Sequence, residues 1–281
     1  MSLNCLIKDT SMDVKNLIYD PESFLLGIED SCSAEITEYM NQRTEEWKAR
    51  GKNKAIRSSS LGTCIRQSYY GYYSERESTP ITDEVARRRM YMGFVNEETQ
   101  AKILGRMPGH LHGVESIEQN QFPVHLNITE SVTYTATTDF VHEYEWKDQK
   151  YYIPMELKST ELWKWKEFKY HPYHLKQILL WMYYAKEKLN LNVPYGVLMY
   201  TKRSSMENKY VVISCDTRFE KMSREVQKYD YWKPWLDNHV NTITSSILNE
   251  GVPPRPTDVP QYICTGCTYL DLCNRNANYN E

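Results

Sequence analysis

Three cysteines near the C-terminus constrain the fold of this chain more than any other feature. Cys264, Cys267 and Cys273 form a Cys-x2-Cys-x5-Cys pattern, and Gly266 gives the first turn the backbone freedom that it needs. Two thiolates separated by two residues can reach one metal centre from a single tight turn. Three ligands leave a four-coordinate centre one ligand short, and Cys64, at the start of an expected helix, is the best candidate for the fourth. We therefore predict that the C-terminal segment folds back onto the region around Cys64.

Four cysteine ligands suit either a structural zinc ion or a 4Fe–4S cluster, and the spacing does not decide between them. The chain has seven cysteines, an odd number, and no signal peptide is visible, so a disulfide framework is not expected. Cys5, Cys32 and Cys215 are expected to be small buried thiols. A coincidental grouping that binds no metal is a further alternative.

The composition indicates a folded cytoplasmic protein. Of the 281 residues, 41% are hydrophobic, and the net charge is only −3, which excludes a disordered chain. Apolar runs such as residues 178–185 are far shorter than the about 20 residues that cross a bilayer, so no membrane association is expected. The overall charge does not indicate nucleic-acid binding, although a local groove can still be positive.

The order of the expected elements predicts a mixed α/β core in one domain. We expect an N-terminal helical appendage over residues 1–56, a core over 57–250 and a cysteine-rich tail over 251–281 that packs back on Cys64. Strands are expected over residues 131–145, 151–157, 195–201 and 209–214, with a hairpin turn at 148–150. Helices are expected over residues 34–50, 59–74, 83–105, 173–189 and, interrupted by Pro234, 217–249.

The predicted hairpin contains acidic and basic residues at positions that suit metal-dependent hydrolysis. Glu156 and Lys158 are two apart on one strand and therefore point to the same face, where Asp139 of the neighbouring strand can meet Glu156. Two carboxylates with open positions suit Mg²⁺ or Mn²⁺, which lowers the pKa of a bound water and polarises a phosphate. A neighbouring lysine can orient that water. The alternative is an ordinary ion pair on the surface of a strand.

The helix expected over residues 173–189 has two distinct faces. One face is aliphatic and is expected to pack on the sheet. The other presents amide, imidazole, indole and phenol groups that could contact a phosphate or a base, and it consists of Tyr173, His174, Gln177, Trp181 and Tyr184. The alternative is that these aromatic residues belong to the core.

These motifs, in their order along the chain, resemble the iron–sulfur RecB-like nucleases of the PD-(D/E)xK superfamily. The resemblance covers roughly residues 58–275 and leaves the first 56 unexplained. The nearest branch is that of the "Cas four" nucleases of CRISPR adaptation, and AddB-type and exonuclease-five-type nucleases share the layout. The residues that carry the resemblance are Cys64, Asp139, Glu156-x-Lys158, Gln177 and Cys264-x2-Cys267-x5-Cys273.

The resemblance implies a restriction-endonuclease-like core, with a mixed central sheet flanked by helices, that hydrolyses DNA phosphodiester bonds, often from an end of single-stranded DNA. It implies a 4Fe–4S cluster at the four cysteines and a Mg²⁺ or Mn²⁺ ion at Asp139, Glu156 and the backbone carbonyl of Leu157. Lys158 would be the catalytic lysine and Gln177 an active-site support. Iron rather than zinc follows from the resemblance alone.

Two positions differ from the family pattern. A metal-binding histidine is usual on the long first helix, and Asn96 stands there, so we expect weaker metal binding or an altered metal preference. We expect Asn96 to share an inward face with Met92, Thr99 and Ile103. A tyrosine is usual four residues after the glutamine, where this chain has Trp181, and Tyr184 on the same face is the candidate to replace it.

The expected partner is DNA, as a single strand or at duplex ends, together with CRISPR-integrase or recombination proteins, and an oligomer is possible. Basic and aromatic residues are the candidate contacts: Arg87, Arg88, Trp163, Lys164, Trp165, Lys166, His174 and Trp181. One rival hypothesis is a DNA-binding RecB-like module with weak or no cleavage, acting in a recombination or spacer-integration complex. The other is a protein stapled by zinc that is not a nuclease.

Overall fold

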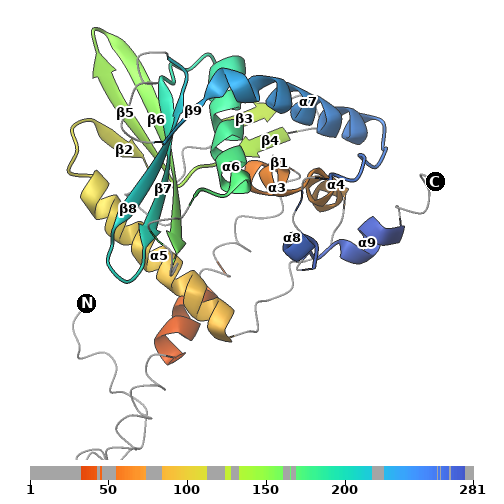
Figure 1. Ribbon diagram of the computed structural model, residues 1–281, viewed down its shortest axis with the longest axis horizontal. Helices are drawn as coiled ribbons and strands as arrows, with labels where there is room; N and C mark the ends of the chain where they lie inside the picture. The colour runs from red at the N-terminus through yellow and green to blue at the C-terminus, as the bar shows by residue number, and fades with distance from the viewer. Residues whose placement is uncertain are drawn as a thin grey trace, which may run out of the picture. The chain divides into compact units, whose positions relative to one another are not determined.

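The computed structural model of the chain (Figure 1) describes residues 33–42, 45, 55–73, 84–112, 124–127, 133–160, 165, 169–216, 225–257, 259, 261–265 and 267–275. It divides into two compact units, Met1–Lys52 with Ile81–Met92 and Asn53–Pro80 with Gly93–Glu281. In the first unit, residues 33–42 are helical. The second unit contains both sheets and the C-terminal segment, and helix α5 (Glu84–Leu104) crosses the boundary between the units.

Six strands form the larger sheet, in the order β2-β5-β6-β7-β8-β9. The pairs β6–β7 and β8–β9 are parallel, and the other neighbours are antiparallel, so the sheet is mixed as expected. Its strands are β2 (His110–His112), β5 (Phe140–Trp146), β6 (Gln149–Thr160), β7 (Tyr195–Lys202), β8 (Asn208–Ser214) and β9 (Glu225–Lys228).

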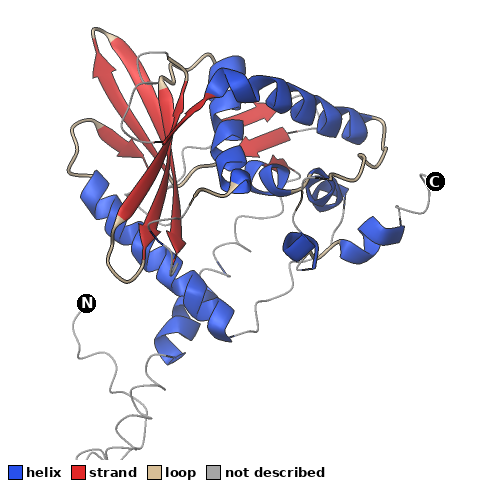
Figure 2. Cartoon of the chain, viewed as in Figure 1, coloured by secondary structure: helices blue, strands red, loops and turns tan. Residues whose placement is uncertain are grey.

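A smaller sheet has the order β1-β4-β3, and Figure 2 shows it apart from the larger one. Its strands are β1 (Ala55–Arg57), β3 (Val124–Asn127) and β4 (Thr133–Ala136). Besides α5, the described part of the second unit contains the helices α3 (Ser58–Thr63), α4 (Ile65–Tyr73), α6 (Pro172–Tyr183) with its π-helical extension η3 (Tyr184–Lys188), α7 (Tyr229–Leu248), α8 (Gln261–Thr265) and α9 (Leu270–Arg275). Helix α6 packs on β6, β7, α3 and α7, which makes it the centre of the second unit.

The side chains on the two sides of β6 pack on different parts of the core. Ile153, Met155 and Leu157 pack with Ala101 of α5 on one face of the sheet. The residues between them point to the opposite face because side chains alternate along a strand. On that face the core is built around α6, whose Ile178, Leu179 and Leu180 are fully buried. Glu156 and Lys158 therefore lie on the α6 side of the sheet.

The structure corrects the predicted hairpin in two ways. The strand expected over 131–145 is interrupted at residues 137–139, so β4 belongs to the smaller sheet and β5 to the larger one. An alternating pattern cannot reveal this because it continues across the interruption. The turn lies at Lys147 and Asp148, not at 148–150, and both residues have positive φ (52° and 59°). Paired positive φ values match the twist of antiparallel strands in a two-residue turn.

Two predicted helices also differ from the structure. The helix expected over 59–74 is broken at Cys64, whose φ of −155° and ψ of 123° are extended. The helix expected over 217–249 begins at Tyr229, since residues 225–228 pair with β8 as a strand, and residues 217–224 lie outside the described residues. Pro234 does not interrupt α7, because Leu236, Val240 and Ile243 continue its buried face into the core. No helix in the described part of the chain is both long and apolar enough to cross a bilayer.

Candidate active site

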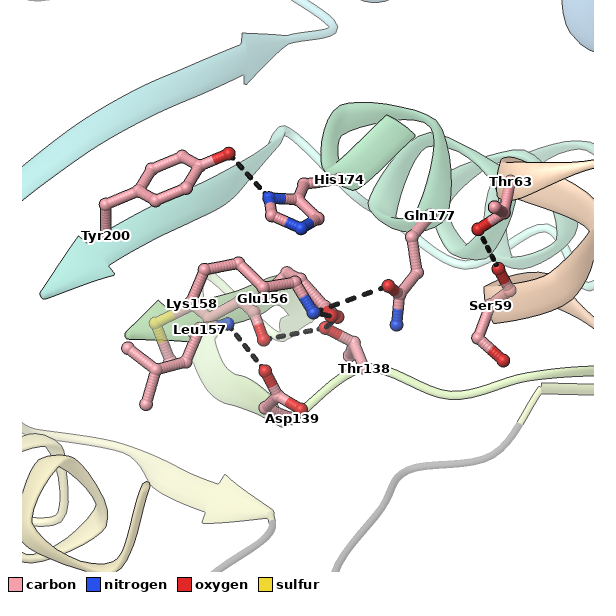
Figure 3. Close-up of polar contacts among 11 residues, drawn as sticks. Ser59, Thr63, Thr138, Asp139, Glu156, Leu157, Lys158, His174, Gln177 and Tyr200 are labelled. Carbon is pink, nitrogen blue, oxygen red and sulfur yellow. Dashed lines mark hydrogen bonds and ion pairs between the residues drawn. The ribbon is translucent and has the colours of Figure 1, made fainter. Parts of the chain in front are cut away.

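Three charged residues meet where β5 begins beside β6. Asp139 immediately precedes β5, and β6 continues past that point with Glu156 and Lys158 on the face toward α6. The ammonium of Lys158 donates to Oε1 of Glu156 at 2.5 Å (Figure 3). Glu156 is completely buried, so this is not the exposed ion pair that the sequence left open.

The backbone holds both carboxylates in fixed positions. The amide N–H of Leu157 donates to Oδ2 of Asp139 at 2.6 Å. The hydroxyl of Thr138 donates to the carbonyl of Met155 at 2.6 Å, and its oxygen lies 3.4 Å from Oε2 of Glu156. These bonds connect the start of β5 to β6 (Figure 3), so Asp139 and Glu156 approach each other before any cation is bound.

Burial makes the site unfavourable for two bare carboxylates. Desolvation, together with the neighbouring charge of Asp139, raises the pKa of Glu156 to about 8. Burial also raises the pKa of Asp139, although Lys158 opposes this. For Lys158, burial disfavours the charged form, but Glu156 and Asp139 outweigh it and raise the pKa of the ammonium above its usual range. Lys158 is therefore cationic, and a further cation at the carboxylates would relieve their mutual repulsion.

Helix α6 brings Gln177 and His174 to the lysine, and Tyr200 of β7 meets them there. The amide oxygen of Gln177 lies 3.5 Å from the Lys158 ammonium. Nδ1 of His174 lies 2.8 Å from the Tyr200 hydroxyl, which also accepts the backbone N–H of His171 at 3.0 Å. Burial, followed by the charge of Lys158, lowers the pKa of His174 to about 3, so the imidazole is neutral. The contact between Nδ1 and the Tyr200 hydroxyl fixes the orientation of the ring.

Helix α5 places an unsatisfied amide against the sheet. Asn96 is 5% exposed, and among the described residues neither its Oδ1 nor its Nδ2 has a hydrogen-bond partner. The amide of Gln100, one turn later, donates to Thr201 of β7 at 3.4 Å, and the charge of Glu97 contributes to the raised pKa of Glu156. The face of α5 around Asn96 therefore lies close to the carboxylates. The prediction that Asn96 shares an inward face with three other residues is wrong, because Met92, Thr99 and Ile103 are exposed.

Several predicted DNA contacts are buried or lie outside the described residues. Trp181 has no exposed surface, and Tyr184 is packed against Tyr134 of β4 with ring centroids 5.3 Å apart. Trp165 is only 8% exposed, with the Lys209 ammonium over its ring. The prediction that Trp165 and Trp181 contact DNA is therefore wrong, as is the prediction that Tyr184 faces the site. The smaller sheet and α7 cover this side of α6, which a helical wheel cannot show. Trp163, Lys164 and Lys166 lie outside the described residues.

Arg87 and Arg88 belong to the first unit, whose position relative to the site is not defined. Arg88 is exposed, and its guanidinium lies 3.5 Å from the Ser33 hydroxyl within that unit. Their predicted contact with DNA stays a prediction.

The four cysteines that the sequence grouped line one cavity. Cys64, Cys264, Cys267 and Cys273 surround a volume of about 30 Å³, together with Tyr70 and Tyr269 among others. The break between α3 and α4 directs Cys64 toward the tail, and burial, the largest cause, raises the pKa of its thiol. Nowhere in the described ranges do three Asp, Glu, His or Cys side chains converge closely enough to share a single ion. By their chemistry the four cysteines suit a group bound by thiolates, but their sulfurs are not placed as ligands of one ion.

Helix α3 connects the cysteine cavity to the carboxylate site. Gly62, two residues before Cys64, approaches the backbone of α6 so closely that an added Cβ would lie 3.1 Å from the amide nitrogen of Gln177. The side chain of Gln177 extends from α6 to within 3.5 Å of the Lys158 ammonium. The position of Cys64 is therefore linked to that of Lys158 through one packed contact and one hydrogen bond.

Sequence reasoning missed Thr138, Tyr200 and Arg66. Thr138 bonds to Met155 of the neighbouring strand β6, and Tyr200 of β7 is the parallel partner of Lys158 in the register of β6 and β7. No periodicity within one strand could indicate such a role. Arg66 lies two residues after Cys64, and its buried position depends on the C-terminal tail.

A family model described as "PD-(D/E)XK nuclease superfamily" matches residues 30–274, which include every residue of both sites. A search of curated proteins found no match. Among solved structures, one described as "Crystal structure of SSO0001" is 13% identical, with a TM-score of 0.49, and the match covers 85% of this chain and 96% of that chain.

Proposed function

We propose that this chain, which belongs to the PD-(D/E)XK nuclease superfamily, is a metal-dependent deoxyribonuclease. Its proposed substrate is single-stranded DNA or DNA ends. The observation that carries the proposal is the arrangement of Asp139 and Lys158 around the buried Glu156. Two carboxylates whose pKa values are raised by burial, beside a charged lysine, form a site that suits a divalent cation and a phosphate.

The residues present fit a Mg²⁺ or Mn²⁺ ion. Asp139 and Glu156 supply carboxylate oxygens, and the amide of Asn96 on the neighbouring helix is buried without a partner in the described part of the chain. The N–H of Leu157 points to Asp139, and the carbonyl of a strand residue points to the same side as its N–H, so we expect the Leu157 carbonyl to face this site. When bound, the ion would lower the pKa of a water and polarise the phosphate.

The other polar residues then have separate tasks. Lys158 orients the attacking water and stabilises the negative charge that develops on the phosphate. Gln177 holds the lysine from α6. His174, neutral and bonded to Tyr200 through Nδ1, has Nε2 left for contact with the substrate. Asp139 and Thr138 keep β6 in register at the site.

Metal-dependent digestion of labelled DNA tests the proposal. The wild-type protein is expected to shorten a single strand labelled at its 5′ or 3′ end with Mn²⁺ or Mg²⁺, and to leave it intact with EDTA. Asp139→Asn keeps the shape of the side chain but removes the charge that helps to hold the cation, so cleavage is expected to fall by about 100-fold or more. A wild type that cleaves equally well in EDTA would contradict the proposal, and the two labels give the polarity.

Asn96→His tests whether the α5 position limits metal binding. An imidazole nitrogen binds Mn²⁺ more tightly than an amide oxygen does, so the variant is expected to bind Mn²⁺ about 10-fold more tightly than wild type. Titration of Mn²⁺ by calorimetry measures this without any DNA. Thr99→His, on the exposed face of the same helix, is the matched control. Equal affinity in wild type and Asn96→His would place the residue outside the metal site.

The cysteine cavity favours a second part of the proposal, a 4Fe–4S cluster that fastens the tail to Cys64 as in the iron–sulfur nucleases that the chain resembles. Zinc remains the alternative, and the iron and sulfide content of anaerobically purified protein distinguishes the two. A role in CRISPR adaptation, recombination or repair is proposed from the same resemblance. The rival, a DNA-binding module with weak cleavage, is motivated by Asn96 and Trp181, and tight DNA binding without cleavage in any divalent metal would favour it.

A further inference from the structure

Arg66 is a buried cation beside the cysteine cavity. Its side chain belongs to α4 and is 2% exposed, and it also lines the cavity. Nε donates to the carbonyl of Pro253 at 2.8 Å, and Nη1 donates to the carbonyl of Cys273 at 3.2 Å. The same Nη1 lies 3.5 Å from the Cys273 sulfur. Arg66 therefore contacts the C-terminal tail at both ends of its guanidinium.

No acidic side chain neutralises this charge within the described ranges. The ion pairs of the described residues involve other cations, and the partners of Arg66 are two carbonyl oxygens and one sulfur. A buried guanidinium without an anion is unfavourable, because carbonyl dipoles replace only part of its hydration. Arg255 also lines the cavity, but it is exposed, so water screens its charge. An anion beside Arg66 would remove this imbalance.

The other side of the cavity also favours negative charge. Cys64 occupies the position before the first residue of α4, and the backbone N–H groups of Arg66 and Gln67 hydrogen-bond its sulfur. A sulfur at this position accepts hydrogen bonds from backbone N–H groups of the first helical turn, as the oxygen of a capping side chain does. The helix start and Arg66 therefore face four cysteines whose sulfurs become anionic when they bind a metal.

We propose that Arg66 is the built-in counter-charge of the four-cysteine metal group, and that it couples binding of the group to docking of the C-terminal tail. The inference rests on the proposed cysteine-bound group and not on the nuclease reaction. Four thiolates with one Zn²⁺, or with a 4Fe–4S cluster, carry a net negative charge next to the guanidinium. Arg66 is a positioning residue here: it fixes Cys273 and Pro253, and the metal group is held by the cysteines.

Titration of the full-length chain with Co²⁺ tests the proposal. Protein stripped of metal under reducing, anaerobic conditions is titrated with Co²⁺, whose absorption from thiolate ligands separates this site from the carboxylate site. Arg66→Gln is expected to weaken Co²⁺ binding by about 10- to 100-fold, and Arg66→Lys, which keeps the charge, by less. Anaerobically purified Arg66→Gln is expected to contain little iron or zinc. Arg275→Gln, an arginine that is 72% exposed on α9, is the control and should match wild type.

Thermal unfolding with and without chelator separates a counter-charge from a residue that merely supports the fold. Without metal, Arg66 is an uncompensated buried charge, so Arg66→Gln should melt at or above the temperature of stripped wild type. With metal, the variant should melt well below wild type. Unchanged Co²⁺ affinity would overturn the proposal, as would equal destabilisation in both states or a variant unfolded in both. A wild type that binds no Co²⁺ through thiolates also overturns it, and the proposed nuclease function is then still tested separately by DNA digestion.

Discussion

Lys158→Ala is expected to lower the rate of DNA cleavage by about 10²- to 10³-fold, the largest loss expected from a single change at the carboxylate site. The lysine is held between Glu156 and Gln177, and the carboxylates keep its ammonium charged although it is partly buried. A positive charge fixed in this way needs no reorganisation when negative charge develops on the phosphate. Initial rates on an end-labelled single strand with Mn²⁺ measure the loss.

Lys150→Ala is the matched control, because Lys150 lies on the same strand but pairs with Glu143 at a surface position where its side chain is 60% exposed. It should cleave as wild type does. Lys158→Ala also removes the cation beside the buried Glu156 and its neighbour Asp139, so thermal unfolding must show that the variant is folded. If folded Lys158→Ala and wild type give the same products at the same rate, the catalytic assignment of Lys158 is wrong.

The period of a strand was sufficient to predict the core of this site. Glu156 and Lys158 lie two residues apart and share a face, and Asp139 meets them because β5 is the hairpin partner of β6. The grouping of four cysteines was likewise predictable from their spacing, and they line one cavity. The expected mixed α/β fold is confirmed. Each of these predictions depends on local geometry or on ligand chemistry.

The errors share a physical cause, which is that periodicity reports the polarity of a face but not what covers it. Trp181 and Tyr184 carry polar atoms, which suggested a face open to DNA. The structure instead covers that face with Tyr134 of the smaller sheet and with α7. The switch of strand at residues 137–139 builds that second sheet, and nothing in the alternation of residues marks it. Tyr200 and Arg66 were missed for a related reason, since both obtain their partners from distant segments.

The second large effect is expected from Cys64→Ala, which should remove most of the bound metal and release the C-terminal tail. Helix α9 has no fully buried residue, and only its Leu272 and Cys273 pack, partly buried, against the core. Besides the bonds from Arg66 to Cys273, the contacts between α4 and this segment include the rings of Tyr70 and Tyr269, with centroids 6.0 Å apart, and the Tyr70 hydroxyl, 3.5 Å from the Leu272 carbonyl. A structural metal group contributes several kcal/mol or more, so the melting temperature should fall by about 10 °C or more.

Metal analysis, thermal unfolding and limited proteolysis check this prediction, with Cys215→Ala as the control because that cysteine does not line the cavity. Cys215→Ala should retain the metal, and cuts within residues 251–275 should appear only in Cys64→Ala. Cleavage of DNA should fall as well, because Gly62 packs on the backbone of Gln177, which positions Lys158. A Cys64→Ala protein with full metal content would show that Cys64 is not a ligand. Loss of metal with unchanged cleavage would show that the cavity fastens the tail without supporting the catalytic lysine.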